Sequence, residues 1–186
     1  KINSVTGEKW EAYDTRPLPI KIPAGMQPWQ TVQLRDAARR ELQRMELPES
    51  IREVTDGPAY GSPPDAIPQP GFPSTPLIAL TARPALNKQF LRYAFKAHAV
   101  GGSSSGLQYW TAENESAECL YLILALTRDG DRHALDWFAS TEIGDTDGYG
   151  MKEILDAWGH PIHASRRVDG VLIFSRGVDV NDAADD

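Results

Sequence analysis

The sequence predicts an α+β fold in which helices come first and a small antiparallel sheet comes last. The first observation is apolar spacing of helical period, which recurs along most of the chain up to residue 138. The second is a pair of short strand-like runs, 161–166 and 171–175. Between them stands Asp169-Gly170, a strong hairpin signal because glycine supplies the positive φ that a tight turn needs.

Two helices are expected in the N-terminal part of the chain. Residues 1–14 fit the last turns of a helix with one apolar stripe, formed by Ile2, Val5, Trp10 and Tyr13. Four prolines between residues 17 and 28 then enforce an extended connection. A second amphipathic helix is predicted over 29–47, and Pro48 stops it. Its apolar face consists of Leu34, Ala38, Leu42 and Met45.

Residues 56–83 form a proline-rich segment that we expect to be irregular. It contains seven prolines and three glycines, a composition that sustains neither a helix nor a central strand. A loop of this length is typically a binding loop, an arm or a linker, and both an ordered arm over the core and a mobile segment fit the sequence. No internal repeat is present, so we expect one domain over residues 1–186 that contains this segment.

Three more helices are predicted before residue 139. The first, 84–99, opens on a proline, and its apolar face holds Leu86, Phe90, Tyr93, Ala94 and Ala97. A helix over 112–127 is apolar nearly all round from Ala117 onward, which places it at the centre of the core. Its Cys119 is the single cysteine, so it excludes an intrachain disulfide, and we expect it to be a buried small hydrophobe. A short helix over 131–138 has Asp131 as its expected N-cap.

The charge of the chain argues against nucleic acid as a partner. The formal net charge is −7 and the sequence pI is about 5.1, whereas binding to a phosphate backbone needs clustered Lys and Arg. The nearest basic cluster, Arg35, Arg39, Arg40 and Arg44, is interspersed with Asp36, Glu41 and Glu46, so it predicts a solvated helix face. No run of 18 apolar residues exists, and the chain as given is expected to be soluble.

The C-terminal stretch carries a family resemblance. Residues 153–179 contain an Asp-x-Trp-Gly-x-Pro segment, two strand-like runs and a Ser-x-Gly-x-Asp ending, formed by Asp156, Trp158, Gly159, Pro161, Ser175, Gly177 and Asp179. This stretch resembles the end of a pseudopilin of type II secretion. The resemblance extends to a planctomycete-type group of pseudopilin-like proteins, over residues 8–20, 35–54, 117–138 and 142–162.

The resemblance implies a pilin-like fold, with N-terminal helices packed against a small C-terminal antiparallel sheet and Trp158 anchoring that sheet. It implies a non-catalytic structural subunit of a pseudopilus or related envelope filament, anchored in the inner membrane by a preceding hydrophobic helix and located in the periplasm or cell envelope. Other pilin-like subunits would be its partners through that helix. An extracytoplasmic binding module that uses residues 56–83 is the alternative.

A calcium site is the sharpest chemical hypothesis, and it falls on residues 145–156. Acidic residues at alternate loop positions with a glycine at the bend are typical of calcium loops, and the family resemblance favours calcium as well. The candidate ligands are Asp145, Asp147, Tyr149, Met151 through its carbonyl, Glu153 and Asp156. Tyr149 and Asp156 depart from the usual ligand types. The competing interpretation is an acidic turn whose Asp side chains cap local backbone donors.

Other possible sites are weaker. Ser104, in Gly102–Gly106, formally matches the nucleophile elbow of hydrolases, but the strand that should precede it is missing, so a flexible loop is favoured. His160 and His163 flank Pro161 and are expected to be a surface pair rather than metal ligands, and His98 and His133 have no visible acidic or cysteine partner. The scattered tryptophans are expected to be core anchors: Trp10, Trp29, Trp110, Trp137 and Trp158.

Overall fold

Helices supply most of the ordered structure in the computed structural model of the chain. The described residues are 2–22, 24–56, 60–61, 77–78, 80–99, 112–129 and 131–177. Over these ranges there are five α-helices: α1 Ile2–Thr15, α2 Pro28–Glu46, α3 Ile51–Thr55, α4 Ala85–Ala99 and α5 Glu115–Leu126. Together with antiparallel strands toward the C-terminus, they confirm the predicted mixed α+β class.

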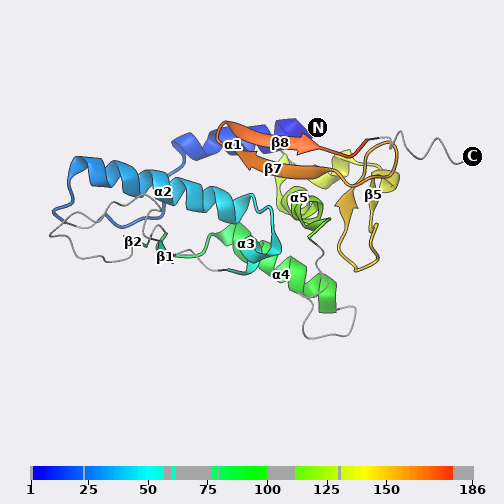
Figure 1. The fold of residues 1–186 in the computed structure, drawn as a ribbon, viewed down its shortest axis with the longest axis horizontal. Helices are drawn as coiled ribbons and strands as arrows, with labels where there is room; N and C mark the ends of the chain where they lie inside the picture. The colour runs from blue at the N-terminus through cyan, green and yellow to red at the C-terminus, as the bar shows by residue number, and fades with distance from the viewer. Residues whose placement is uncertain are drawn as a thin grey trace, which may run out of the picture.

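The described strands form four separate two-stranded antiparallel sheets. The pairs are β1 Tyr60–Gly61 with β2 Leu77–Ile78, β3 Arg128–Asp129 with β4 Arg132–His133, β5 Ile143–Gly144 with β6 Glu153–Ile154, and β7 His163–Arg167 with β8 Gly170–Phe174. Two 3-10 helices, η2 Ala134–Trp137 and η3 Ser140–Glu142, lie between β4 and β5. The hairpin β7–β8 is the longest of the four, and it lies beside α1 (Figure 1).

Helix α5 is the centre of the core, as its composition predicts. Every residue from Ala117 to Leu124 is buried. Cys119, Leu122 and Ile123 pack in one hydrophobic cluster with α2, α3 and α4. Leu120, Tyr121 and Leu124 pack in a second cluster with the start of α1, β6 and β7. The helix therefore joins two clusters through opposite parts of its surface.

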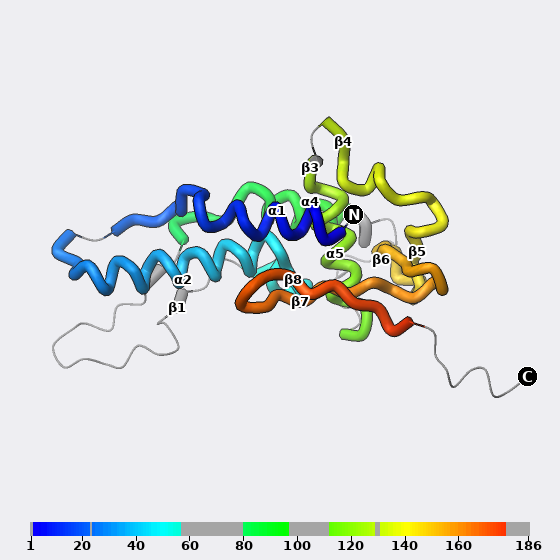
Figure 2. The backbone as a smooth tube through the Cα atoms, turned by 90° about the horizontal axis from the view of Figure 1, so that it is seen from above, coloured from blue at the N-terminus to red at the C-terminus, as the bar shows by residue number. Residues whose placement is uncertain are grey.

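Helices α1 and α2 lie side by side (Figure 2), and a buried carboxylate links them. Glu46, near the end of α2, is 1% exposed, and its Oε2 accepts hydrogen bonds from Tyr13 Oη at 3.2 Å and Arg16 Nη1 at 2.5 Å. Glu41 is also buried and pairs with Arg44 at 2.7 Å. The expectation that these acids lie on a solvated face is therefore wrong, because α1 and α3 cover that part of α2.

The predicted apolar faces of the helices are confirmed where their side chains are described. Ile2, Val5 and Tyr13 of α1 are buried, as are the four predicted residues of α2. In α4, Phe90 and Ala94 are fully buried. Leu86 and Tyr93 pack on the core from its edge. The periodicity of the sequence thus identified which side of each helix faces inward.

The expectation that the tryptophans are core anchors is wrong for three of them. Trp158 is 61% exposed, and Trp29 and Trp137 also have large exposed fractions. Trp158 lies in a turn that Asp156 fixes, because Asp156 Oδ1 accepts the backbone N–H groups of Trp158 and His160, each at 2.9 Å. The turn is thus closed through its backbone, and the indole is left outside. Ala164, Val171 and Ile173 pack the terminal hairpin on the core instead.

Two local predictions need correction. Residues 131–138 form β4 followed by the 3-10 helix η2, so Asp131 is a hairpin residue rather than the N-cap of an α-helix. The backbone N–H of His133 donates to Asp136 Oδ2 at 3.0 Å, which stabilises the start of η2. In the terminal hairpin, Arg167 pairs with Gly170, so residues 168–169 make the turn, one position earlier than expected.

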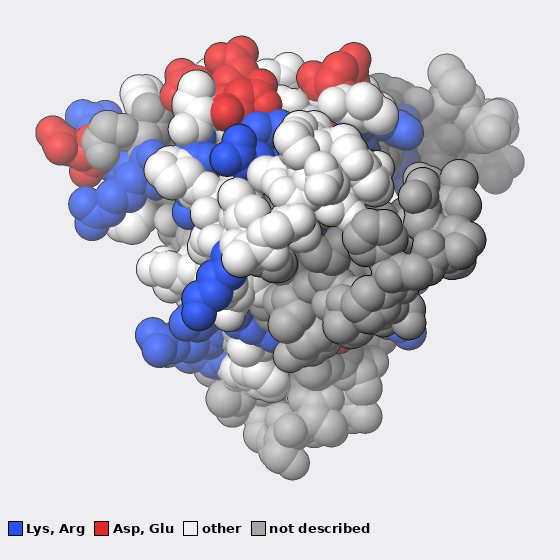
Figure 3. Space-filling view, turned by 90° about the vertical axis from the view of Figure 1, so that its left-hand side faces the viewer, with Lys and Arg blue, Asp and Glu red and all other residues white. Residues whose placement is uncertain are grey.

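Among the described residues on the end of the molecule seen in Figure 3, lysine and arginine side chains do not form one continuous basic face. Figure 3 shows them separated by acidic and uncharged side chains. On α2, Arg39 approaches Asp36 at 3.7 Å and Asp14 at 3.8 Å. These mixed charges agree with the overall acidity of the chain.

Arg166 of β7 ties the terminal hairpin to the helical part of the fold. Its backbone N–H donates to Glu49, its guanidinium pairs with Glu53 of α3, and its Nε lies 3.6 Å from Glu49 Oε1. The Arg166 side chain is 19% exposed and that of Glu53 is 17% exposed. An ion pair this sheltered leaves an uncompensated charge when one partner is removed.

We predict that Arg166→Ala lowers the free energy of unfolding by roughly 1–3 kcal/mol, because Glu53 loses its partner in a sheltered position. Urea unfolding followed by circular dichroism measures the change. Arg167→Ala is the matched control, since Arg167 is the exposed neighbour on the same strand. Equal destabilisation by both substitutions would contradict the role given to Arg166.

Candidate functional site

The loop between β5 and β6 is an acidic turn held by its own side chains. Asp145 Oδ1 accepts the backbone N–H of Gly148 at 2.7 Å, and its Oδ2 accepts that of Gly150 at 2.9 Å. Gly148 and Gly150 have φ values of 76° and 94°, in the left-handed region that favours glycine. The strand pair β5–β6 brings the two ends of the turn together. The turn is therefore a fixed structure that can position side chains.

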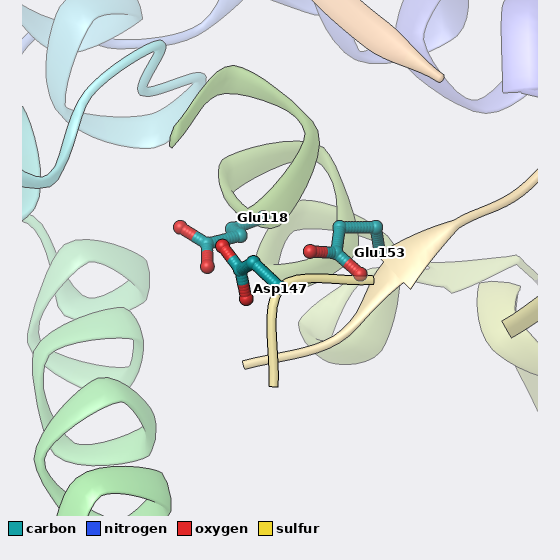
Figure 4. Close-up of side chains that lie close together, drawn as sticks. All are labelled: Glu118, Asp147 and Glu153. Atoms are coloured by element: carbon teal, nitrogen blue, oxygen red, sulfur yellow. The ribbon is translucent and has the colours of Figure 1, made fainter. Parts of the chain in front are cut away.

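Three carboxylates from distant parts of the sequence meet beside this turn. Glu118 comes from α5, Asp147 from the turn and Glu153 from β6. One oxygen from each can be chosen so that all three lie within 4.8 Å of one another. Figure 4 shows the carboxylates of these residues, the acidic cluster, gathered at one place next to α5. The packing of β6 on α5 creates this proximity.

Glu118 is the member of the acidic cluster that is buried without any hydrogen-bond partner among the described residues. It is 0% exposed, because α5 is buried nearly all round. Neither of its carboxylate oxygens has a hydrogen-bond partner among the residues that the structure describes. Burying a carboxyl group without a hydrogen-bond partner costs several kcal/mol of folding free energy. This is about the cost of transferring a polar group from water to an apolar medium. The side chain therefore lacks the compensation that buried acids normally have.

The other two members have partial compensation. Glu153 is also 0% exposed, but its Oε2 accepts the backbone N–H of Thr146 at 3.1 Å. Asp147 is half-buried, and its Oδ1 accepts the N–H of Tyr149 at 3.2 Å. Asn114 Nδ2 lies 3.4 Å from Asp147 Oδ2 and donates to Thr146 Oγ1 at 3.1 Å. These contacts orient Asp147 and Glu153 toward the helix that carries Glu118.

The crowding of negative charge raises the pKa values of the two buried acids. The pKa of Glu118 is raised to about 8, first by burial and then by the charges of Asp147, Glu153, Glu115 and Asp145. The pKa of Glu153 is raised to about 7, first by burial, while the hydrogen bonds from Thr146 oppose the rise and Asp147 and Asp145 add to it. The acidic cluster thus holds protons at a pH where ordinary carboxyl groups have lost them.

The structure separates the six candidate calcium ligands. Asp147 and Glu153 meet in the acidic cluster. Asp145 and Asp156 accept backbone N–H groups within their own turns, as the competing interpretation expects of acidic turn residues. Tyr149 is 46% exposed, and the Met151 side chain is buried in the core.

Sequence reasoning missed Glu118, which lies outside the loop. A signal for it did exist. Glu118 is a charged residue within the apolar run that begins at Ala117. Acidic residues are almost never fully buried unless they have a partner, so an acid in such a run indicates a partner. What the sequence did not contain was the position of Glu118 relative to Asp147 and Glu153, because that depends on how β6 packs on α5.

Among the residues that the structure describes, the remaining candidates do not assemble a second site. His163 is buried rather than on the surface: its ring stacks on Phe174 with a centroid distance of 5.5 Å, and its Nδ1 lies 2.9 Å from Ser116 Oγ. Burial, and then the charge of Arg176, lower its pKa. Cys119 is buried as predicted, and burial raises the pKa of its thiol. Its buried position favours a core role over nucleophilic chemistry.

Several candidate segments fall outside the described residues. These are Ser104 and its glycine-rich loop, Trp110, the side chain of His98 and most of the segment 56–83. Within that segment, Tyr60–Gly61 pairs with Leu77–Ile78, and Leu80 is buried in the core.

Comparison of the chain with protein-family models, with curated proteins and with solved structures gave no match. Among the described residues, no helix combines the length and the apolar character needed to cross a bilayer.

We predict that the chain loses stability as the pH rises from about 5 to about 8. Glu118 has a folded-state pKa of about 8, above the ordinary value of 4.5, so the folded state binds more protons than the unfolded state in that range. Its contribution is present below pH 4.5 and is lost as the pH passes through the folded-state pKa. The loss is roughly 3 kcal/mol, measurable by urea unfolding in buffer with EDTA.

The variant Glu118→Gln isolates this effect, because glutamine has a similar size and does not ionise. Its stability is expected to fall with pH by roughly 3 kcal/mol less than that of the unsubstituted chain, with the loss from Glu153 remaining, and to exceed that of the unsubstituted chain at pH 8. Glu11→Gln is the matched control, since Glu11 is exposed on α1. If the unsubstituted chain and Glu118→Gln lose stability in parallel, the assignment of the pH dependence to Glu118 is wrong.

Proposed function

We propose that the chain is the extracytoplasmic part of a pilin-like structural subunit, which belongs to a pseudopilus or a related envelope filament and has no catalytic role. The proposal starts from the sequence resemblance around Trp158-Gly159-His160-Pro161 and the terminal hairpin. The single observation that carries it further is the packing of α1 along β8 of that hairpin (Figure 1). An N-terminal helix lying on a C-terminal antiparallel sheet is the arrangement that the resemblance implies.

The contacts between α1 and the hairpin support the proposal. Ile2 and Val5, at the start of α1, share a hydrophobic cluster with Ala164 of β7, and Val171 and Ile173 of β8 pack on its edge. These contacts join residues separated by more than 150 positions in the sequence. Such non-local packing holds α1 at a fixed orientation relative to the rest of the domain. A helix that connects the domain to other filament subunits would need this fixed orientation.

The partners in this proposal are other pilin-like subunits, reached through a hydrophobic helix that continues α1 toward the N-terminus. The location would be the periplasm or cell envelope, with an anchor in the inner membrane. The link from Tyr13 and Arg16 to the buried Glu46 supports this use of α1, because it fixes the end of the helix to α2. A mechanical connection from the helix to the body of the subunit follows from these contacts.

We predict that the gene encodes, directly before Lys1, a short basic leader and about 20 apolar residues, enough to cross a bilayer. Expression of the whole gene with a prepilin peptidase should give a precursor and a shorter mature form in the inner-membrane fraction. Cross-linking in cells followed by purification should then recover other filament subunits.

A variant without the leader is the control, and it should stay unprocessed. Recovery of the whole gene product in the soluble fraction, without processing by the peptidase, would contradict the filament proposal. Co-purification of a soluble ligand in place of filament subunits would favour a binding module instead.

A further inference from the structure

We propose that Glu118, Asp147 and Glu153 form a binding site for one divalent cation, and that Ca²⁺ is the cation the site suits best. This site differs from the loop that the sequence indicated, because one of its ligands comes from the central helix α5. The inference does not depend on the filament proposal, since it rests on the contacts of these three residues.

The unpartnered carboxylate of Glu118 is the first reason. Both of its oxygens are buried, and neither has a hydrogen-bond partner within the described parts of the chain. Buried charges in proteins are normally paired or coordinate a metal ion. In Figure 4, the Glu118 side chain ends beside the carboxylate of Asp147, so its free oxygens lie at the acidic cluster. A cation there would supply the partner that the protein does not.

The spacing of the oxygens is the second reason. Ca²⁺ binds oxygen ligands at about 2.3–2.6 Å, so two oxygens on one ion are at most roughly 5 Å apart. The chosen oxygens of the acidic cluster all lie within 4.8 Å of one another. One ion can therefore reach all three carboxylates without a rearrangement of the backbone.

The nature of the ligands selects the class of cation. Three carboxylates offer only oxygen, which suits hard cations such as Ca²⁺ and Mg²⁺ rather than zinc or copper. Mg²⁺ needs near-ideal octahedral geometry and usually keeps several waters. Glu118 and Glu153 are fully buried, and both oxygens of Glu118 are free to bind one ion together. A site with two buried ligands, one of which offers both oxygens, favours Ca²⁺.

The hydrogen bonds of Asp145 and Asp156 separate this site from a conventional calcium loop. Asp145 uses both oxygens to accept the N–H groups of Gly148 and Gly150. Asp156 accepts two N–H groups of the following turn through Oδ1. Asp145 and Asp156 therefore serve their own turns through these bonds. Asp147 and Glu153 instead face α5, where they meet Glu118.

The consequence of binding is a clamp between two distant parts of the chain. The ion would join α5 to the β5–β6 turn, across the edge where Met151 and Ile154 enter the core. It would also cancel the repulsion among the three carboxylates. Calcium should therefore stabilise the folded chain most strongly at the pH values at which those carboxylates are ionised.

Calorimetric titration of the EDTA-treated chain with CaCl₂ at about pH 8 tests the proposal. We expect one ion per chain, with a dissociation constant of roughly 10⁻⁴–10⁻³ M, as in extracellular calcium modules. At about 10 mM CaCl₂ the melting temperature should rise by about 3–10 °C, and by less with MgCl₂. If neither a binding heat nor a rise in melting temperature is seen with CaCl₂, the proposal is wrong.

Three variants identify the ligands. Glu118→Gln and Asp147→Asn should each weaken calcium binding by roughly tenfold or more, because each removes a charged ligand. Asp156→Asn keeps the acceptor of its turn and should bind calcium within about twofold of the unsubstituted chain. Asp147 is half-buried, so its variant remains informative if Glu118→Gln does not fold. Binding that is lost in Asp156→Asn but kept in Asp147→Asn or Glu118→Gln would overturn the site.

Discussion

The burial of helix α5 on nearly all sides is the constraint on which the rest of the structure depends. Its residues from Ala117 to Leu124 are apolar with one charged exception, so water must be excluded from almost its whole circumference. Helix α4 lies against it, as do β6 and β7, while α1 and α2 complete the two hydrophobic clusters that it joins. Among the short sheets, β4, β6 and β7 contact this helix, and the Leu155–Pro161 bridge joins β6 to the segment that enters β7.

The same constraint accounts for the acidic cluster. A carboxyl group at position 118 has to enter the interior, because the helix that carries it has no solvated side there. The strand β6 brings Glu153 against α5, and the turn held by Asp145 brings Asp147. Three acids thus converge where the dielectric screening of water is weak, which raises the pKa values of the two buried ones and makes a cation a favourable partner.

Polar contacts connect this core to the periphery. Asn87 of α4 is fully buried, donates to the carbonyls of Met45 and Glu53, and accepts from Arg83 at 2.7 Å. Glu115, at the start of α5, accepts the N–H of Ile51 at 2.7 Å and so caps α3. Arg166 connects the terminal hairpin to α3. The terminal hairpin is therefore fixed to the helical body by a polar contact as well as by apolar packing.

The sequence alone determined most of the local structure of this protein. The apolar faces of α1, α2 and α4 and the central position of α5 follow from spacing, because burial selects one face of each element. The terminal hairpin follows from the Asp169-Gly170 signal between two strand-like runs. Tertiary structure decided the rest. Trp158 is exposed because its turn closes through backbone hydrogen bonds to Asp156 and does not need the indole. His163 is buried because the hairpin places its ring beside Ser116. Glu118 lies beside Asp147 and Glu153 because of tertiary packing. Contacts between residues far apart in the chain produce no pattern of spacing from which the sequence could have predicted this.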